Sequence, residues 1–543
     1  MKRCVKALML AIFLITLTAC VGSNYDYDDP ETENYEYEDY EIEIDDVALP
    51  DVVLPYYPAA EAYDDIALPY YPEIEIEPEP IVLDFSYALA QVCIRRQGIA
   101  KPGYNELLAL TGGRVPGALP DILFDHTLPN RTAGRRLAVS QATEDIETFF
   151  AAMRNAYAGY EYFGGDAVFL PIKEAIMAEL YALGGGISLS TLQNVLVNHL
   201  SPIINDNHFF IQPTFLSTPH FISVIDGLFY DRSTNGFNSQ ETGLYLKAVE
   251  GHEIEEIMQL HANIEGGLFY RPVLRGDMVF GEPIYFTYEN GESIARQFQL
   301  YRPQSRPMQL PTLELHNGIP IISVQALGFD GNANGLWRSH AVTFMPLAEQ
   351  VRYEPAIIID LRSNQGGNGI LPKRWLYALT GEIVPSNFVQ LATGGAEGAE
   401  ASIGSYRFSN PESYSVYFTN FREFGENYRI AFDLPDRVVE REQVLIVLTC
   451  RLTASAGEVF VDLAASMSNT LIIGSPTSGT LAFSGSANMH LPNSGLLFRF
   501  GRAMMVWPDG HFAEGAGIQP DIWADGDALA VALALLRDAG FGD

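Results

Sequence analysis

Apolar and polar positions divide the folded part of the chain into three patterns. Between residues 83 and 200, apolar side chains recur every three to four positions, which predicts amphipathic helices. Between 215 and 302, short apolar runs alternate with turns, which predicts β-strands. From residue 312 onward, continuous apolar runs alternate with helical segments. This last pattern predicts a layered α/β domain with a buried sheet.

The pattern also predicts individual elements. Helices are expected over 83–99, 145–156, 170–183, 192–200, 333–351, 454–466 and 527–540. Buried strands are expected in IPIISVQAL (319–327), AIIIDL (356–361), VLIVLTC (444–450) and NTLIIGS (469–475). The run LLFRFGRAMMVWP (496–508) predicts a β-hairpin arm, and 302–311 predicts a linker.

Composition changes the picture at the N-terminal end. Lys2, Arg3 and Lys6 are basic, Ala7 to Leu17 form an apolar stretch, and the stretch ends in Leu17-Thr18-Ala19-Cys20. This is typical of an export signal, because the apolar stretch is too short to span a bilayer. The ending resembles a bacterial lipobox. It implies lipidation at Cys20 and an anchored chain facing outside the cytoplasm.

Charge is concentrated in the segment that follows. The chain carries a formal net charge of −35, and residues 21–80 hold 20 Asp and Glu with no Lys or Arg. Such a segment cannot build a core and predicts an extended tether. The acidic balance argues against nucleic acid as a partner. Cys93 and Cys450 remain as a possible disulfide, although a buried free thiol at Cys450 is the simpler interpretation.

Two motifs in the C-terminal region are suited to chemistry. In VLIVLTCRLTASAGE, Ser455 stands where a strand ends and a helix begins. It fits a capping box with Glu458, yet the same turn would expose a nucleophile beside free helix N–H groups. In DLRSNQGG, Gly366 and Gly367 follow a buried strand, where exposed N–H groups can hold an oxyanion. Spacing alone leaves the structural and catalytic interpretations open for both.

The ordered set IIIDLRSNQGG, TASAGE, GSPTSGT and EGAGIQPDI resembles the C-terminal processing (tail-specific) peptidase family, across roughly 140–543. The resemblance implies an α/β, ClpP/crotonase-like core with an N-terminal helical segment and an inserted PDZ-like module. It implies that Ser455 is the nucleophile and that Gly366 or Gly367, with Ala456, forms the oxyanion hole.

The base needs a separate argument. One branch of the family uses a Lys after the Ser, but Thr480 stands at that position and no Lys follows Lys373. The tricorn-like branch, which is His-dependent, places its base before the inserted module, where IINDNHF supplies His208 with Asp206 two residues earlier. The resemblance also implies Glu514 as the residue that orients the imidazole.

Alternatives for the base remain at His490 and His511. Asp206, Asn207 and His208 superficially resemble a metal cluster, but no second ligand pair stands at a useful spacing, so the sequence predicts no metal site and implies no cofactor.

The resulting interpretation is a membrane-anchored serine endopeptidase acting on a peptide or protein. The alternative is a catalytically inactive, lipid-tethered binding protein on the same fold. The expected organisation is a signal peptide (1–20), an acidic tether (21–82), a mainly helical region (83–210), a β-rich PDZ-like module (215–302) and a catalytic core (312–543).

Overall fold

The structure is a computed structural model, and the part of the chain that it describes begins at Asp84. The described residues are 84–96, 119–217, 221–233, 235–276, 283–302, 306–328, 342–393, 420–424, 428–432, 438–485, 488–507 and 514–542. The expected signal peptide, Cys20, the acidic tether and His511 lie outside them. Within the described ranges, no helix combines the length and apolar character needed to cross a membrane.

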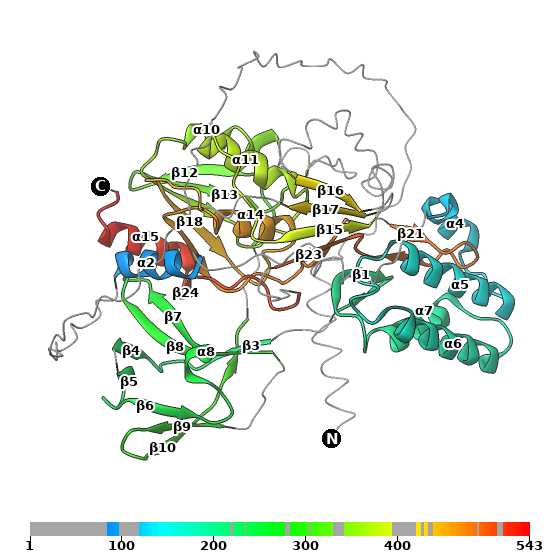
Figure 1. Cartoon of the computed structure of the whole chain (residues 1–543), viewed down its shortest axis with the longest axis horizontal. Coiled ribbons are helices and arrows are strands. Elements are labelled where there is room, and N and C mark those ends of the chain that lie inside the picture. The colour runs from blue at the N-terminus through cyan, green and yellow to red at the C-terminus, as the bar shows by residue number, and fades with distance from the viewer. Residues whose placement is uncertain are drawn as a thin grey trace, which may run out of the picture. The chain divides into compact units, whose positions relative to one another are not determined.

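A twelve-stranded mixed sheet organises the described residues (Figure 1). Its middle is parallel: β13, β14, β18, β19, β24 and β7 pair in that order, and β12 is antiparallel at one edge. The strands of this part are β12 (Thr312–His316), β13 (Ile319–Ser323), β14 (Ala356–Asp360), β18 (Val444–Thr449), β19 (Thr470–Gly474), β24 (Ile522–Asp525) and β7 (Met258–Asn263). The four apolar runs predicted as buried strands thus become adjacent parallel strands.

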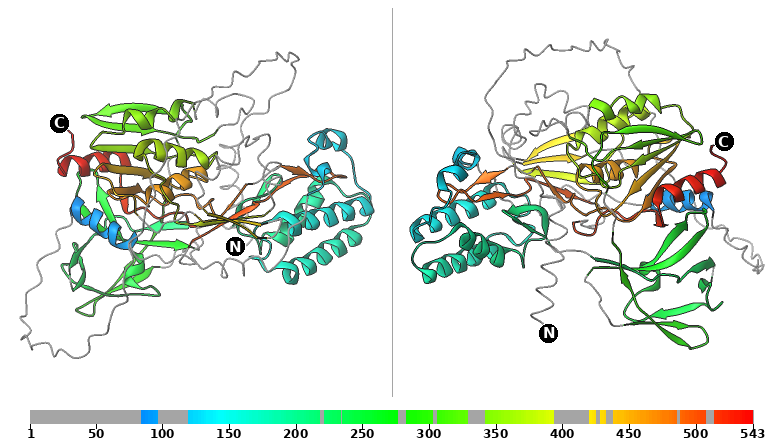
Figure 2. Two further views of the ribbon diagram at one scale, coloured as in Figure 1. Left: turned by 45° about the horizontal axis from the view of Figure 1, so that its top comes forward. Right: turned by 180° about the vertical axis from the view of Figure 1, so that it is seen from behind.

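Helices cover both faces of the parallel strands, because alternate strand residues point to opposite sides. In β14, Ile357 and Ile359 belong to one core cluster, and Ile358 belongs to the other. The first cluster includes α10 (Leu347–Gln350), α11 (Ile370–Thr380) and α14 (Ala456–Ala464). The second includes α2 (Phe85–Arg96) and α15 (Ala528–Asp538), which lie side by side (Figures 1 and 2).

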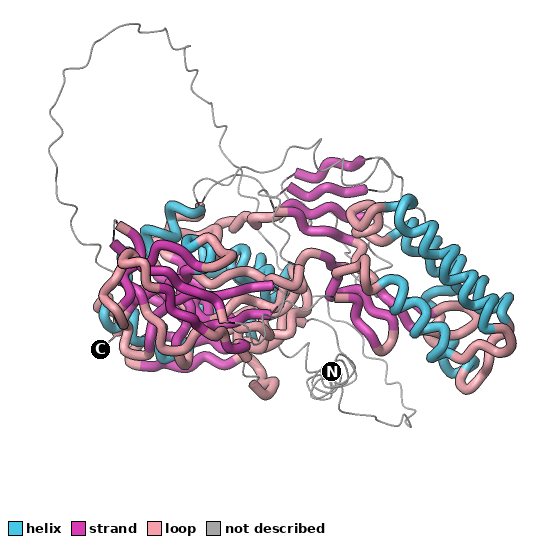
Figure 3. The backbone as a smooth tube through the Cα atoms, turned by 90° about the horizontal axis from the view of Figure 1, so that it is seen from below, coloured by secondary structure: helices cyan, strands magenta, loops and turns pink. Residues whose placement is uncertain are grey.

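The N-terminal helices form their own packed layer. The elements are η1 (Asp121–Phe124), α4 (Leu128–Thr132), α5 (Val139–Ala156), α6 (Gly165–Leu183) and α7 (Leu189–Leu200). Figure 3 shows the helices as neighbouring cyan coils. The periodic residues Ile146, Phe149, Phe150 and Met153 are buried in one cluster, as predicted. They pack against a four-stranded sheet of order β2-β1-β22-β21, made of β1 (Asp206–Ile211), β2 (Thr214–Leu216), β21 (Met489–His490) and β22 (Leu497–Arg499).

The residues that follow the N-terminal helices and precede the catalytic core in the sequence are rich in strands, as predicted. This region contains β3 (Phe221–Val224), β4 (Tyr230–Ser233), β5 (Gly236–Ser239), β6 (Leu246–Val249), α8 (Ile254–Ile257), β8 (Leu268–Gly276), β9 (Ile284–Tyr288), β10 (Ser293–Arg296) and β11 (Gln299–Leu300). It is divided between two sheets: β3, β7, β8 and β11 belong to the twelve-stranded sheet, in which β7 pairs in parallel with β24, whereas β6, β9 and β10 form a three-stranded sheet of their own. The α/β fold class is therefore confirmed, while the likeness of this region to a PDZ module stays a prediction.

The expected hairpin at 496–508 is wrong. Its two halves form β22 and β23 (Ala503–Val506), but these strands do not pair with each other. β22 pairs with β1, whereas β23 joins a five-stranded sheet of order β16-β17-β15-β23-β20. The remaining strands of that sheet are β15 (Val389–Thr393), β16 (Asn420–Phe424), β17 (Tyr428–Phe432) and β20 (Phe483–Ser484). The expected helix at 333–351 lies partly outside the described residues, and α10 is its last part.

Candidate active site

Ser455 lies at a strained turn between β18 and α14. Its backbone has φ 50° and ψ −114°, whereas a regular helix cap has an extended backbone. A residue with a Cβ rarely adopts such a positive φ, and strain of this kind gathers at functional sites. The backbone N–H of Ser455 donates to Glu458 Oε2 and to Thr480 Oγ1, each at 2.9 Å. Ser455 therefore combines the predicted link to Glu458 with the sharp turn expected of a nucleophile.

The predicted glycines lie directly against this turn. A Cβ on Gly366 would be 2.7 Å from Ser455 Cβ and 3.1 Å from the Ala456 nitrogen. Gly366 N–H donates to Asn364 Oδ1 at 2.9 Å. The bridge between Leu327 and Gly367 uses the carbonyl of Gly366 and the N–H of residue 368, which leaves Gly367 N–H outside that bridge. Gly367 and Ala456, rather than Gly366, are thus the better pair of oxyanion donors.

The sequence analysis missed Asn364, which fixes the glycine loop. Asn364 is fully buried, and its Nδ2 donates to the Val324 carbonyl at 2.8 Å. Its own carbonyl accepts the N–H of Ala454 at 2.8 Å, just before Ser455. The side-chain amide of Asn364 thus joins the glycine loop to the end of β13, and its backbone carbonyl joins both to the nucleophile turn. The only sequence signal was an Asn between a buried strand and a Gly pair, which is also typical of an ordinary turn.

Glu458 was predicted only as a capping residue, and its contacts go further. Its Oε2 accepts from the backbone and hydroxyl of Thr480, both at 2.9 Å, besides the N–H of Ser455. Its Oε1 accepts from Thr477 Oγ1 at 2.6 Å and from Gly479 N–H at 2.8 Å. One fully buried carboxylate therefore joins the nucleophile turn to the turn 477–480. Thr480, at the position of the absent Lys, contributes hydroxyl hydrogen bonds to this link.

Glycines explain how two distant loops meet beside Ser455. A Cβ on Gly479 would lie 2.6 Å from the backbone of Gly515, and one on Gly517 would lie 2.2 Å from the Thr477 carbonyl oxygen. Two backbone segments can approach this closely only at residues without side chains. Arg451 strengthens the contact by donating to the carbonyls of Gly515 and Ala516, both at 3.0 Å. The motifs GSPTSGT and EGAGIQPDI thus form one packed unit.

The predicted base and its partner come together in a second cluster. Asp206, His208 and Glu514 each offer a side-chain ligand atom, and these atoms lie within 4.8 Å of one another. Asp206 Oδ1 accepts the N–H groups of His208 and Phe209 at 2.7 and 3.1 Å. Strand β1 therefore carries both the imidazole and the carboxylate that shapes its backbone.

Backbone donors hold Glu514 in this cluster. Its Oε1 accepts the N–H of Asn207 at 2.6 Å, and its Oε2 accepts the N–H of Ala482 at 3.0 Å. Burial raises the pKa of Glu514 well above its usual range, and the nearby charge of Asp206 adds to the effect. Burial also raises the pKa of Asp206 to about 7. Two buried carboxylates this close favour holding a proton between them.

The surroundings of His208 favour its neutral form, because they lower the pKa of the imidazole. Its side chain is partly accessible, while its Nδ1 is fully enclosed. Burial, helped by the positive charge of Arg499, lowers the pKa of His208 to about 4. A neutral imidazole is the form that accepts a proton from a nucleophile.

The two clusters are linked through Asn207. Its Nδ2 donates to the Gly479 carbonyl at 2.8 Å, and Gly479 N–H in turn donates to Glu458. No hydrogen bond joins Ser455 to His208 within the described ranges. The alternative His490 lies on β21, where its ring contacts His126 with centroids 5.5 Å apart.

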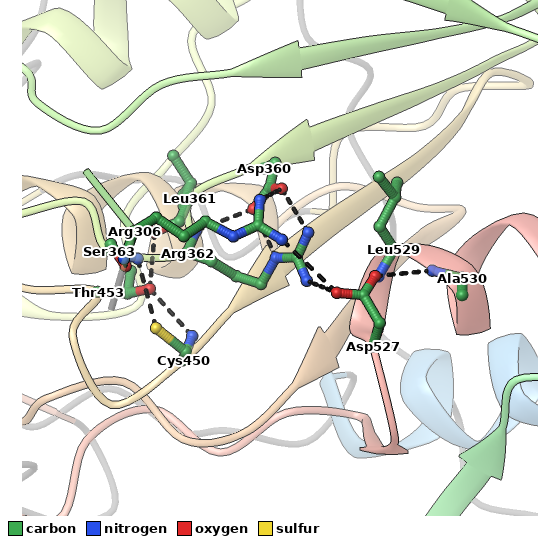
Figure 4. Close-up of polar contacts among 10 residues, drawn as sticks. All are labelled: Arg306, Asp360, Leu361, Arg362, Ser363, Cys450, Thr453, Asp527, Leu529 and Ala530. Atoms are coloured by element: carbon green, nitrogen blue, oxygen red, sulfur yellow. Dashed lines mark hydrogen bonds and ion pairs between the residues drawn. The ribbon is translucent and has the colours of Figure 1, made fainter. Parts of the chain in front are cut away.

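An ion-pair network supports the glycine loop from the opposite end (Figure 4). Asp360, buried at the end of β14, accepts from Arg306 Nη1 at 2.8 Å and from Arg362 Nε and Nη2 at 2.9 and 2.7 Å. Arg362 also reaches Asp527 at 2.9 Å, at the start of α15. Ser363 Oγ accepts the N–H of Arg306 at 3.0 Å. The network ties the segment after 302, β14 and α15 together at the base of the glycine loop.

Cys450 belongs to the same surroundings. It is a buried free thiol, and its Sγ accepts the N–H of Ser363 at 3.3 Å. The simpler interpretation of this cysteine is therefore confirmed. The side chain of Cys93 is outside what the structure describes.

Comparison with known proteins tests the resemblance. Residues 347–524, about a third of the chain, match the family described as peptidase family S41. The matched segment is similar to a peptidase family S41 domain. It contains Ser455, Ala456, both glycines and Glu514, and it identifies a serine-type peptidase, as predicted. His208 lies outside the matched segment, so the His-dependent assignment stays a prediction.

Solved structures of peptidases align with much of the chain. Mature CPAF aligns over 75% of this chain and 99% of its own, with 14% identity and a TM-score of 0.39. A putative peptidase from Parabacteroides merdae aligns over 75% and 100%, with 15% identity and a TM-score of 0.35. The photosystem II D1 C-terminal processing protease aligns over 73% and 97%, with 14% identity and a TM-score of 0.34. A search of the curated proteins found no match.

Proposed function

We propose that the chain is a membrane-anchored serine endopeptidase that works through an acyl-enzyme on Ser455. The observation that carries the proposal is the contact between the strained Ser455 turn and the glycine loop. It supports an oxyanion hole beside the nucleophile, for which we propose the N–H groups of Gly367 and Ala456. A carbonyl oxygen that becomes negative during attack would accept from both.

The proposed reaction follows from this arrangement. Ser455 Oγ attacks the carbonyl carbon of the scissile peptide, and its proton passes to His208. The negative oxygen of the tetrahedral intermediate accepts from Gly367 and Ala456. When the C–N bond breaks, His208 returns the proton to the leaving amine, and water later hydrolyses the acyl-enzyme with the same base.

Glu514 supports the proposed base through the backbone. It holds the N–H of Asn207, the residue before His208, and its carboxyl group faces the same cluster. Because no hydrogen bond links Ser455 and His208 within the described ranges, the reaction requires the two side chains to come into hydrogen-bond contact when substrate binds. The same observation favours the alternative, a catalytically inactive, lipid-tethered binding protein on this fold.

A fluorophosphonate probe separates the two functions. We expect the full chain to be labelled, and we expect Ser455→Ala and His208→Ala to lose the label. His490→Ala, which changes a histidine outside the cluster, serves as the matched control and should keep it. Labelling that persists in His208→Ala but is lost in His490→Ala would assign the base to His490 instead of His208. A folded wild type without label would support the binding protein.

Membrane anchoring rests on the lipobox resemblance at Cys20 and needs its own test. We expect a radiolabelled fatty acid to be incorporated into the chain in a bacterial host, and the chain to sediment with membranes. Cys20→Ser should abolish both, whereas Cys450→Ser should change neither. Incorporation that persists in Cys20→Ser would remove the anchor from the proposal.

A further inference from the structure

The cluster of Asp206, His208 and Glu514 has unsatisfied polar atoms at its centre. Asp206 is fully buried, and its Oδ2 has no hydrogen-bond partner within the described residues. His208 Nδ1 is enclosed and also has none there. The hydroxyl of Tyr157 lies close enough to influence Asp206, but it makes no hydrogen bond of regular geometry. Buried polar atoms of this kind ordinarily have a partner, so their environment is suited to a ligand.

Backbone hydrogen bonds fix the three side chains in place. The N–H groups of His208 and Phe209 hold one oxygen of Asp206, and the second oxygen has no hydrogen-bond partner of regular geometry among the described residues. Two N–H groups from separate segments hold Glu514. Hydrogen bonds that orient the ligating side chains in this way are a regular feature of metal sites.

Distance and charge both permit a divalent cation. Two donors at about 2.0 to 2.2 Å from a tetrahedral zinc ion lie about 3.4 Å apart. The ligand atoms here lie within 4.8 Å of one another, so the widest pair would have to approach by up to about 1.4 Å on binding. A bound cation would displace the proton that Asp206 and Glu514 hold between them. The carboxylates of Asp206, Glu514 and Glu458 then outnumber the guanidinium groups of Arg499 and Arg451 by one charge.

We propose that Asp206, His208 and Glu514 bind a borderline divalent cation of the Zn²⁺ type, and that the bound cation inhibits the peptidase. One imidazole and two carboxylates match the ligands that Zn²⁺ accepts, whereas Mg²⁺ and Ca²⁺ prefer oxygen alone. Coordination through either ring nitrogen removes the base, because the other nitrogen of a neutral imidazole then carries the hydrogen. The inhibitory part rests on the proposed function, and the binding part does not.

Binding is tested on the full-length Ser455→Ala variant, which cannot digest itself. Equilibrium dialysis with Zn²⁺ should show one bound ion per chain, and Co²⁺ should give the visible absorption of tetrahedral coordination. Asp206→Asn, His208→Ala and Glu514→Gln should each weaken binding at least about tenfold. His199→Ala is the matched control, because His199 pairs with Glu179 at the surface and offers a second His–carboxylate site. The His199→Ala variant should still bind one Zn²⁺ per chain.

The outcomes separate the two parts of the proposal. Zn²⁺ binding that is lost in the three cluster variants, with labelling of wild type suppressed by Zn²⁺ and restored by a chelator, supports both. Binding without any effect on a labelled wild type overturns inhibition. Binding that is unchanged in Asp206→Asn and Glu514→Gln, while both variants keep the wild-type circular dichroism, overturns the site, as does the absence of binding. The binding results hold even if the chain proves not to be a peptidase.

Discussion

The nucleophile region and the base region are built in different ways. Ser455 and the glycine loop stand at the ends of two adjacent parallel strands, β18 and β14, and short-range hydrogen bonds shape both. His208 and Glu514 are 306 positions apart and meet only because β1 and the 514–517 loop contact the same turn at Gly479. The first region is therefore fixed by the sheet, while the second depends on packing between layers. We expect substitutions to separate these two dependencies.

The largest effect is expected from Gly367→Ala. A Cβ at this position would lie 2.0 Å from the Leu327 carbonyl oxygen, and φ is 138°. Because the atom that the Cβ would meet belongs to the backbone, the glycine loop must move. We expect fluorophosphonate labelling to fall at least ~100-fold. Gly236→Ala is the control: φ is 122° and nothing lies within 4 Å, so it should cost only about 1 to 2 kcal/mol of stability. Equal labelling of the two variants would contradict the geometry.

Glu458→Gln should damage both regions at once. The amide places an NH₂ group where one oxygen now accepts N–H and hydroxyl donors, and it removes a buried charge that those donors stabilise. We expect a loss of about 3 kcal/mol in unfolding free energy, measured by urea titration, together with weaker labelling. The exposed Glu253→Gln should change neither quantity. A fully stable, normally labelled Glu458→Gln would show that the link between the regions is dispensable.

Asn207→Ala should affect the base region alone. It removes the hydrogen bond to the Gly479 carbonyl but keeps the N–H that Glu514 holds. We expect a stability loss of about 1 kcal/mol and a labelling rate lower by roughly 10- to 100-fold, because the base is then misplaced. If the rate is unchanged while stability falls, the contact is structural only.

The smallest effect is a pH dependence of stability at Asp462, on α14. Burial raises its pKa from 3.8 to about 6. The folded state then binds the proton more tightly, so this contribution is complete below pH 3.8 and is lost as the pH rises through about 6. The unfolding free energy of wild type, relative to Asp462→Asn, should fall across this window by on the order of 1 to 3 kcal/mol. Parallel stability curves would contradict it.

The sequence determined the central sheet and its helices. Continuous apolar runs such as VLIVLTC can only be buried on both faces, so they predicted the parallel strands correctly. The capping pattern at Ser455 and Glu458 was also visible, because it is local. The same logic failed at 496–508. A hairpin and two strands of separate sheets share one alternating pattern, and only the packed layers distinguish them.

Tertiary structure alone decided which polar groups meet. Nothing local to Asn364 indicates that it joins three backbone segments, and nothing local to Glu458 indicates that it holds a turn more than twenty residues away. The cluster of Asp206, His208 and Glu514 likewise exists because glycines let two loops approach at backbone distance. The periodicity of apolar residues predicts which face of its own helix or strand a residue occupies. Hydrogen bonds between elements depend on where the packed layers bring them, which no single segment encodes.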